Sequence, residues 1–184
     1  YKALRYAKDM LKMYDSMANV TIYNKVAARL RLGENFFYVD SLQHALEEER
    51  KAYRMAMKAG DSNLLSYVRQ NLASTFEEMG EKDSCLYYAR LAYDLNAANR
   101  FSCLLTFASA YISVDSLNQA FSLLNQALPK TAEDRYSVFY FQSQAAMKAQ
   151  DFKSAKSFSD SAYHYLEDMY RTALQGKAAY YTSF

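Results

Sequence analysis

Small side chains recur along this sequence at intervals of 35 residues, and this register is the strongest constraint on its fold. One series occupies Ala73, Ala108, Ser143 and Ala178. Two further series keep the same interval, namely Cys85, Ala120 and Ala155, and then Ala92, Ala127 and Ala162. A fixed interval of this length is typical of proteins built from stacked copies of one supersecondary unit. We therefore expect an array of repeats.

The composition indicates that each repeat is helical. The 184 residues include only 4 Gly and 1 Pro, too few for the tight turns of a β-sandwich or barrel or for Gly-rich phosphate loops. An aromatic ring follows the small residue by three positions at Phe76 and Tyr111, which suits helices that pack closely together. Each unit is therefore predicted to contain two helices joined by a short turn.

The register also predicts the boundaries of the units. The expected organisation is a half repeat, four helix pairs and a second half repeat: 1–18, 19–60, 61–97, 98–130, 131–167 and 168–184. The last segment is expected to be a first helix whose partner lies beyond the sequence. Because both ends stop in mid-repeat, we interpret the whole chain, 1–184, as a single array cut from a longer protein.

Turn-forming and capping residues are assigned from the same register. Gly33 and Gly80 are predicted to lie near turns within pairs, and Gly60 and Pro129 near turns between pairs, whereas Gly176 falls inside the last predicted helix. Side-chain oxygens that accept a backbone N–H are favoured at helix N-caps. The N-cap candidates for second helices are Asp83, Asp115 or Ser116, and Asp151.

These features resemble tetratricopeptide repeats (TPR). The resemblance rests on the 35-residue period, on the step Leu72-Ala73-x2-Phe76 and on the later small residues Cys85 and Ala92. It implies an all-α fold, an α-α superhelix (solenoid) of antiparallel helix pairs. The absence of Trp and the cysteine at position 85 depart from the usual pattern. The Asp-Ser pairs, such as Asp40-Ser41, are loosely similar to the TPR region of Bacteroidetes membrane-anchored regulators.

No arrangement in the sequence predicts a catalytic, metal or cofactor site. His44, Glu47 and Glu48 could face one ion, but a metal site needs three or four ligands and the only other histidine is His164. We interpret the run from Glu47 to Lys51 as a solvated charged face. The motifs of nucleophile elbows, zinc proteases, redox dithiols and phosphate loops are absent from the sequence. The protein is therefore predicted not to be an enzyme and to need no cofactor.

Bulk properties limit the partners. With 22 basic and 20 acidic residues the formal charge is +2, which gives no reason to expect nucleic-acid binding. The apolar runs are only a few residues long, so no membrane span is predicted in this segment. The two cysteines, Cys85 and Cys103, are expected to be buried thiols too far apart for a disulfide.

The TPR resemblance implies that first helices line a concave groove that binds a peptide. The family's groove positions carry over to Asn24, Ala28, Arg31, Tyr67, Gln70, Ser74, Glu77, Ser102, Leu105, Ser109, Ile112, Tyr140, Gln144 and Met147. TPR proteins that grip acidic chaperone tails use a Lys/Asn/Arg clamp, and Gln70 with Ser74 does not match it. The expected partner is therefore an uncharged or mixed peptide segment, provided that Tyr67 and Tyr140 face the groove rather than the core.

Three functional hypotheses follow. The first is a non-enzymatic scaffold that binds a protein or peptide in the groove. The alternative is a ligand-sensing region of a membrane-anchored signalling or transcriptional regulator, which would make the full-length protein periplasmic or membrane-anchored. The third is self-association through the apolar face of the last helix, at Ala178, Tyr181 and Phe184.

Overall fold

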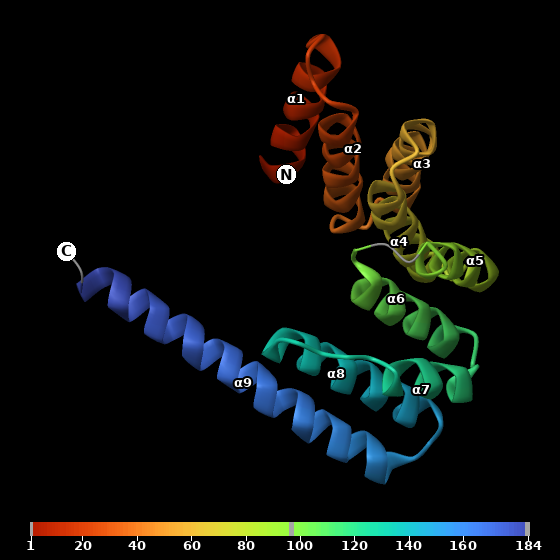
Figure 1. Cartoon of the computed structure of the whole chain (residues 1–184), viewed down its shortest axis with the longest axis vertical. Helices are drawn as coiled ribbons and strands as arrows, with labels where there is room; N and C mark the ends of the chain where they lie inside the picture. Colours follow the sequence, from red (N-terminus) through yellow and green to blue (C-terminus); the bar gives the residue numbers. More distant parts are fainter. Residues whose placement is uncertain (1, 96–97, 183–184) are drawn as a thin grey trace. The chain divides into compact units, whose positions relative to one another are not determined.

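The computed structural model describes residues 2–95 and 98–182, with side chains described at the C-terminal end up to residue 175. Within these ranges the secondary structure is entirely helical (Figure 1). The helices are α1 (Lys2–Ser16), α2 (Ile22–Phe37), α3 (Leu42–Ala59), α4 (Ser62–Glu78), α5 (Lys82–Tyr93), α6 (Arg100–Ser113), α7 (Leu117–Asn125), α8 (Ala132–Lys148) and α9 (Phe152–Thr182). They fall into two compact units, Tyr1–Ala110 and Tyr111–Phe184.

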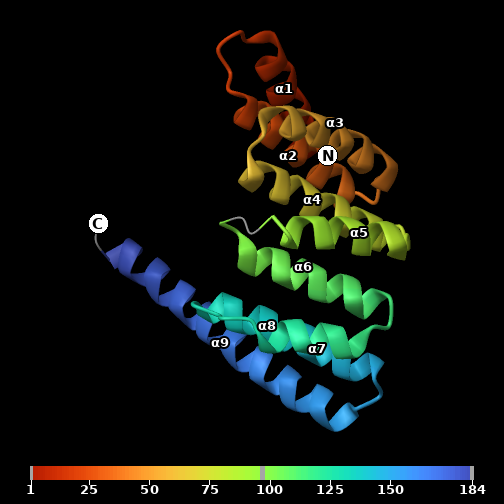
Figure 2. The same cartoon turned by 45° about the vertical axis from the view of Figure 1, so that its right-hand side comes forward.

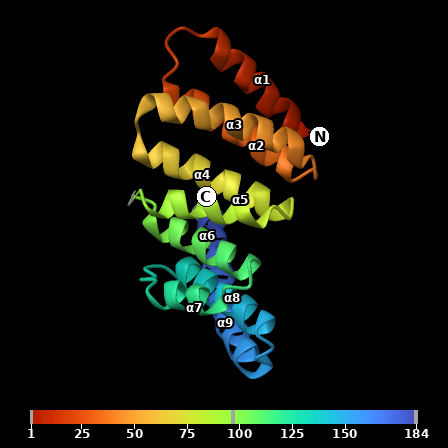
Figure 3. The same cartoon turned by 90° about the vertical axis from the view of Figure 1, so that its right-hand side faces the viewer.

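In the first unit, α1 packs against α2, α2 against α3, α3 against α4 and α4 against α5, and α2 also contacts α4 (Figures 2 and 3). Neighbours such as α4 and α5 run antiparallel. The core between them is built largely from small side chains, because these let the helix backbones approach closely. The predicted small positions Ala73, Cys85, Ala92 and Ala108 are each 0–1% exposed. The small-residue register is therefore confirmed in this unit.

In the second unit, α8 packs against both α7 and α9, and α8 and α9 run antiparallel (Figure 1). The predicted small residues here are buried at Ala120, Ser143, Ala155 and Ala162, whereas Ala127 is half-buried. The Phe139 ring stacks on Tyr165 at a centroid distance of 5.8 Å. Ala178, Tyr181 and Phe184, the residues of the self-association hypothesis, lie outside the described side chains.

Two of the predicted glycine turns are confirmed. Gly60 ends α3 and Gly80 follows α4, with φ angles of 67° and 73° that glycine adopts without strain. The predicted turn at Gly33 is wrong, because Gly33 lies inside α2. A Cβ at that position would sit 3.3 Å from Glu49 Cγ and 3.4 Å from the Ala45 carbonyl oxygen. Gly33 therefore provides room for α3 rather than a turn.

The predicted N-caps are confirmed in part. Asp151 Oδ1 accepts a hydrogen bond from the Ser154 N–H at 3.1 Å. Ser116 occupies the N-cap position of α7, but its side chain makes no capping hydrogen bond. Asp83 is not an N-cap, because α5 begins at Lys82, after Glu81, and Asp83 lies in its first turn. Helix α5 therefore starts two residues before the position that an N-cap at Asp83 would give.

Helix α9 is continuous over 31 residues, from Phe152 to Thr182 (Figure 1). Residues 168–181 therefore extend the second helix of the preceding pair, and the break expected near residue 167 is wrong. Gly176 lies within this helix. None of the helices in the described ranges has an apolar stretch that would suffice to span a membrane.

Candidate functional site

The structure separates the predicted groove residues of the first unit into two groups. Asn24, Arg31, Tyr67 and Ser74 are exposed on α2 and α4. Ala28 and Gln70 are buried, Glu77, Leu105 and Ser109 are half-buried, and Ser102 is exposed but hydrogen-bonded. Ala28 belongs to the core that α2 shares with α1. Gln70 and Glu77 of α4 bond residues of α6, whereas Tyr67 and Ser74 of the same helix lie beside α2.

One seam joins α4 to α6 through a series of hydrogen bonds that we call the polar ladder. Ser102 Oγ donates to Gln70 Oε1 at 2.5 Å, and Ser109 Oγ donates to Glu77 Oε1 at 2.9 Å. Near the start of α4, Ser66 Oγ donates to Asn99 Oδ1 at 2.5 Å. Gln70, Glu77 and Ser109 therefore link successive first helices.

The other seam, between α2 and α4, contains a hollow of about 270 Å³ that we call the Tyr67 hollow. It brings the predicted residues Arg31 and Tyr67 together. The other lining residues are Tyr23, Ala27, Leu30, Glu34 and Leu64. Tyr23 and Tyr67 are 56% and 49% exposed, so both rings are available to a ligand.

A second hollow of about 260 Å³, the Glu49 hollow, lies on the same seam and shares Glu34 with the first. Its lining comprises Glu34, Phe37 and Tyr38 from α2 and its C-terminal end, Glu49 from α3, and Asn71, Ser74 and Thr75 from α4. Ser74 is the only one of these predicted from the sequence. The two adjoining hollows make the α2–α4 seam the candidate site.

The position of Glu49 corrects the interpretation of the charged run in α3. Glu48 and Glu49 are only 8% and 2% exposed, so this part of the run is not solvated. Both residues lie on the inner face of α3 with Ala45, Ala52 and Ala56, at helical spacing. Burial raises the pKa of Glu49 to about 7, a hydrogen bond from Thr75 opposes this shift, and the charge of Glu34 adds to it.

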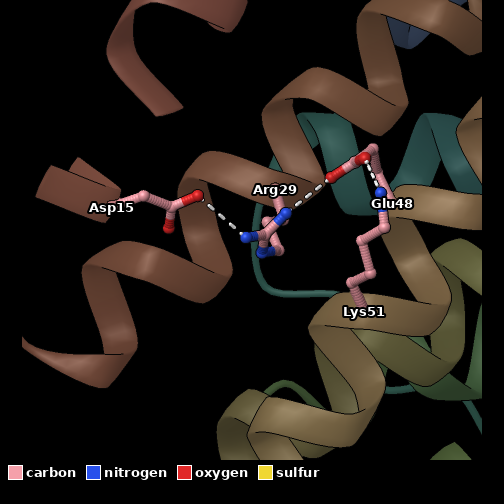
Figure 4. A network of polar contacts seen from close by, with 4 residues as sticks. All are labelled: Asp15, Arg29, Glu48 and Lys51. Atoms are coloured by element: carbon pink, nitrogen blue, oxygen red, sulfur yellow. Dashed lines mark hydrogen bonds and ion pairs between the residues drawn. The ribbon is translucent and has the colours of Figure 1, made fainter. Parts of the chain in front are cut away.

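Glu48 belongs to a separate network that fixes α2 against α1 and α3 (Figure 4). Arg29 Nη1 lies 2.9 Å from Glu48 Oε2, and Arg29 Nη2 lies 3.0 Å from Asp15 Oδ2. Lys51 Nζ completes the network at 2.5 Å from Glu48 Oε1. Because Arg29 and Glu48 are mostly buried, this network sets the position of the α2 wall of the seam.

The other chemically notable side chains have structural surroundings. His44 Nδ1 lies 2.9 Å from Ser41 Oγ, and its ring stacks on Phe36. The part of the chain that the structure describes contains no group of three or more His, Cys, Asp or Glu side chains that could hold a metal ion. Cys85 and Cys103 are buried without a disulfide, as predicted. Burial raises the pKa of the Cys103 thiol, which disfavours its nucleophilic form.

The predicted groove residues of the second unit lie on α8, except for Ile112, which lies near the C-terminal end of α6. Tyr140, Gln144 and Met147 are exposed, and the Tyr140 ring stacks on Tyr136. Ile112 is half-buried. Its carbonyl oxygen accepts a hydrogen bond from Lys148 Nζ at 2.6 Å.

Comparison with solved structures identifies the fold. Two crystal structures of a putative kinesin light chain from Podosopora anserina, with nearly identical TPR-like repeats, match this chain with TM-scores of 0.70 and 0.67. They are each 12% identical to it, cover 92% and 91% of it, and are covered over 88% and 87% of their own length. The crystal structure of BtubC (BKLC) from P. vanneervenii matches with a TM-score of 0.72 and 16% identity, over 91% of this chain and 73% of that one.

The fold is TPR-like. These matches confirm the predicted class, an all-α superhelix of antiparallel helix pairs. No protein-family model matches the sequence, and no curated protein matches it. The neighbours carry no indication of a membrane-anchored regulator, so that narrower resemblance stays a hypothesis. Repeats of this kind stack into solenoids that present extended concave surfaces.

Proposed function

We propose that this protein is a non-enzymatic scaffold whose first unit binds an extended peptide along the α2–α4 seam. The observation that carries the proposal is the pair of hollows that adjoin at Glu34. Together they offer exposed aromatic rings, an apolar floor at Leu30 and Leu64, and charged or amide groups at the rim. Sites for peptides commonly combine aromatic anchors with a few polar groups in this way.

The polar ladder narrows the set of residues that contact a ligand. Gln70 is 7% exposed and its side-chain oxygen already accepts from Ser102, so its removal would disturb the helix packing. Tyr67 lines the hollow and is half exposed, so its ring can be removed with little effect on packing. Tyr67 is therefore the informative position.

The test is a selection of peptides from a random display library on the purified protein, followed by affinity measurements on the selected peptides. Tyr67→Ala is expected to weaken their binding by about tenfold or more, as for a ring at an interface centre. The matched control is Tyr163→Ala, since Tyr163 is exposed on α9 in the other unit. Equal binding by the wild type and Tyr67→Ala, or a selection that yields no peptide, would refute the proposal.

The alternative, a region that senses a small ligand, predicts a different result. Wild-type protein would then yield no peptide in the selection, whereas a small molecule would protect Tyr67 and Tyr23 from solvent. This outcome is detected by adding mixtures of small metabolites to the purified protein and measuring whether the tyrosine fluorescence of the protein is quenched.

A further inference from the structure

The carboxyl group of Glu49 is buried with only one of its two oxygens satisfied. Oε1 accepts a hydrogen bond from Thr75 Oγ1 at 2.8 Å. Oε2 is buried and has no hydrogen-bond partner among the described residues. Leaving such an oxygen without a partner costs on the order of 1–3 kcal/mol. A group held at this cost is a candidate for binding a donor that arrives from outside.

The surroundings leave room for that donor. The Glu49 side chain passes Gly33, where any larger residue would contact its Cγ. Glu49 lines the Glu49 hollow together with Phe37 and Tyr38 from the α2 side and Asn71 and Ser74 from α4. Tyr38 is 83% exposed, so the entrance is bordered by a ring that is free to contact a ligand.

The charge of the hollow selects a cation. The lining, as the structure describes it, holds the two carboxyl groups of Glu34 and Glu49 and no basic side chain. Asn71, Ser74 and Thr75, which face it from α4, are uncharged. A neutral donor would leave the repulsion between the two carboxylates in place, whereas an ammonium or guanidinium group would neutralise it and supply several N–H donors.

A metal ion fits the hollow less well than an organic cation. Metal sites usually need at least three protein ligands, and the described residues contain no cluster of three His, Cys, Asp or Glu side chains that could hold an ion. The aromatic rings of Phe37 and Tyr38 instead suit a cation of low charge density, which binds favourably over ring faces. The aliphatic stem of a Lys or Arg side chain also suits this partly apolar entrance.

We propose that the Glu49 hollow receives the Lys or Arg side chain of a peptide that lies along the α2–α4 seam. This rests on the proposed function and adds the chemistry of the partner: a segment with one basic residue, set beside apolar or aromatic residues that occupy the Tyr67 hollow.

The first test is independent of peptide selection. The ¹³C resonance of the Glu49 carboxyl is followed against pH with and without Nα-acetyl-arginine amide or Nα-acetyl-lysine amide. Either probe is expected to bind with a Kd on the order of 1 mM and to lower the pKa of Glu49 by about one unit or more. Nα-acetyl-norleucine amide, which lacks the charge, is the control. A pKa of Glu49 that stays unchanged at 20 mM of both basic probes would overturn the proposal.

Three variants distinguish binding of the basic probes in the Glu49 hollow from their general attraction to acidic residues on the surface. Glu49→Gln keeps the side-chain shape and can still accept from Thr75, and it is expected to weaken binding of the basic probes about tenfold. Glu34→Gln, on the exposed rim, should weaken it less. Glu47→Gln removes the same charge from an exposed position of α3 and should change nothing. Equal weakening by Glu47→Gln and Glu49→Gln would show general electrostatic attraction and overturn the assignment.

The peptide selection distinguishes this proposal from the proposed function. Peptides selected on the wild type should share a basic residue, and that preference should disappear on Glu49→Gln. Selected peptides that depend on Tyr67 but show no basic preference would overturn the cation site and leave the scaffold function standing. Basic probes that bind while no peptide does would overturn the peptide form of the proposal and indicate a free small cation.

Discussion

Helix α4 forms two seams, and they differ in what occupies them. Toward α6, its polar side chains are bonded in the polar ladder, with Gln70 to Ser102 and Glu77 to Ser109. Toward α2, Tyr67 lines an open hollow. The same helix therefore presents one face that is committed to packing and one that is available to a partner. Residues at equivalent groove positions in a repeat need not share a role.

The first prediction removes support from the open seam. Arg29→Met deletes the cation between Asp15 and Glu48 and leaves Glu48 mostly buried beside Lys51 alone. Loss of one partner from a mostly buried ion pair costs about 4 kcal/mol. Chemical denaturation should show this loss, and hydrogen exchange should rise in α2 more than in α4.

Asp15→Asn provides the control for Arg29→Met. Asp15 is 46% exposed, so its removal should cost less than about 1 kcal/mol. If the two variants lose equal stability, then the buried part of the network does not hold α2.

The second prediction uses the titration of Glu49 at the floor of the open seam. Its pKa is raised from 4.5 to about 7 in the folded protein. As the pH rises, the unfolded chain loses the Glu49 proton before the folded protein does. The stabilisation that the protonated Glu49 provides is therefore complete below pH 4.5 and is lost as the pH rises to about 7. The free energy of unfolding should fall by about 3 kcal/mol across this window on account of this group.

Glu49→Gln isolates that contribution. The difference in unfolding free energy between the wild type and this variant should change with pH between 4.5 and 7 and be flat outside it. Glu47→Gln, on the exposed side of α3, should keep the wild-type pH dependence. A parallel curve for Glu49→Gln would show that the carboxyl is not buried as the structure places it.

The third prediction breaks the closed seam. Gln70→Ala leaves the Ser102 hydroxyl without its Gln70 acceptor and removes a buried amide, which should cost about 2 kcal/mol in a urea melt. Tyr67→Ala, three residues earlier on α4, should change stability by less than about 0.5 kcal/mol but weaken peptide binding by about tenfold or more. The reverse pattern would exchange the roles of the two seams.

The fourth and smallest effect lies outside both seams and serves as a baseline. Thr131 and Asp134 form a capping box at the start of α8, and the backbone N–H of Lys130, followed by that of Thr131, lowers the pKa of Asp134. Thr131→Ala should therefore cost about 1 kcal/mol by thermal melting. Peptide affinity at the α2–α4 seam should not change, and a loss there would mean that the seam is not the whole site.

Part of the site was within reach of sequence reasoning. Arg31, Tyr67 and Ser74 were placed on first helices by counting along the register, and the structure finds them at the two hollows. Gln70 and Glu77 were counted in the same way, but each bonds a serine 32 residues further along the chain. That equal spacing was a usable signal for the polar ladder.

Glu49 was missed for a reason that the sequence also contained. Its place in a run of charges suggested a solvated face, although its spacing from Ala45, Ala52 and Ala56 puts it on the inner side of α3. Gly33 was assigned to a turn because glycine is common there, whereas α2 uses it for close approach to Glu49. Only the packing of two helices reveals that second use.

The sequence by itself determined the helical class, the 35-residue register and the burial of its small residues, because these depend on local propensity and on spacing along one chain. The tertiary structure decided which polar side chains bond one another, where α9 continues instead of breaking, and which seam of α4 stays open. Those outcomes depend on distances between residues that are far apart in sequence, and a periodicity along the chain can suggest candidate pairs but does not decide which of them come into contact.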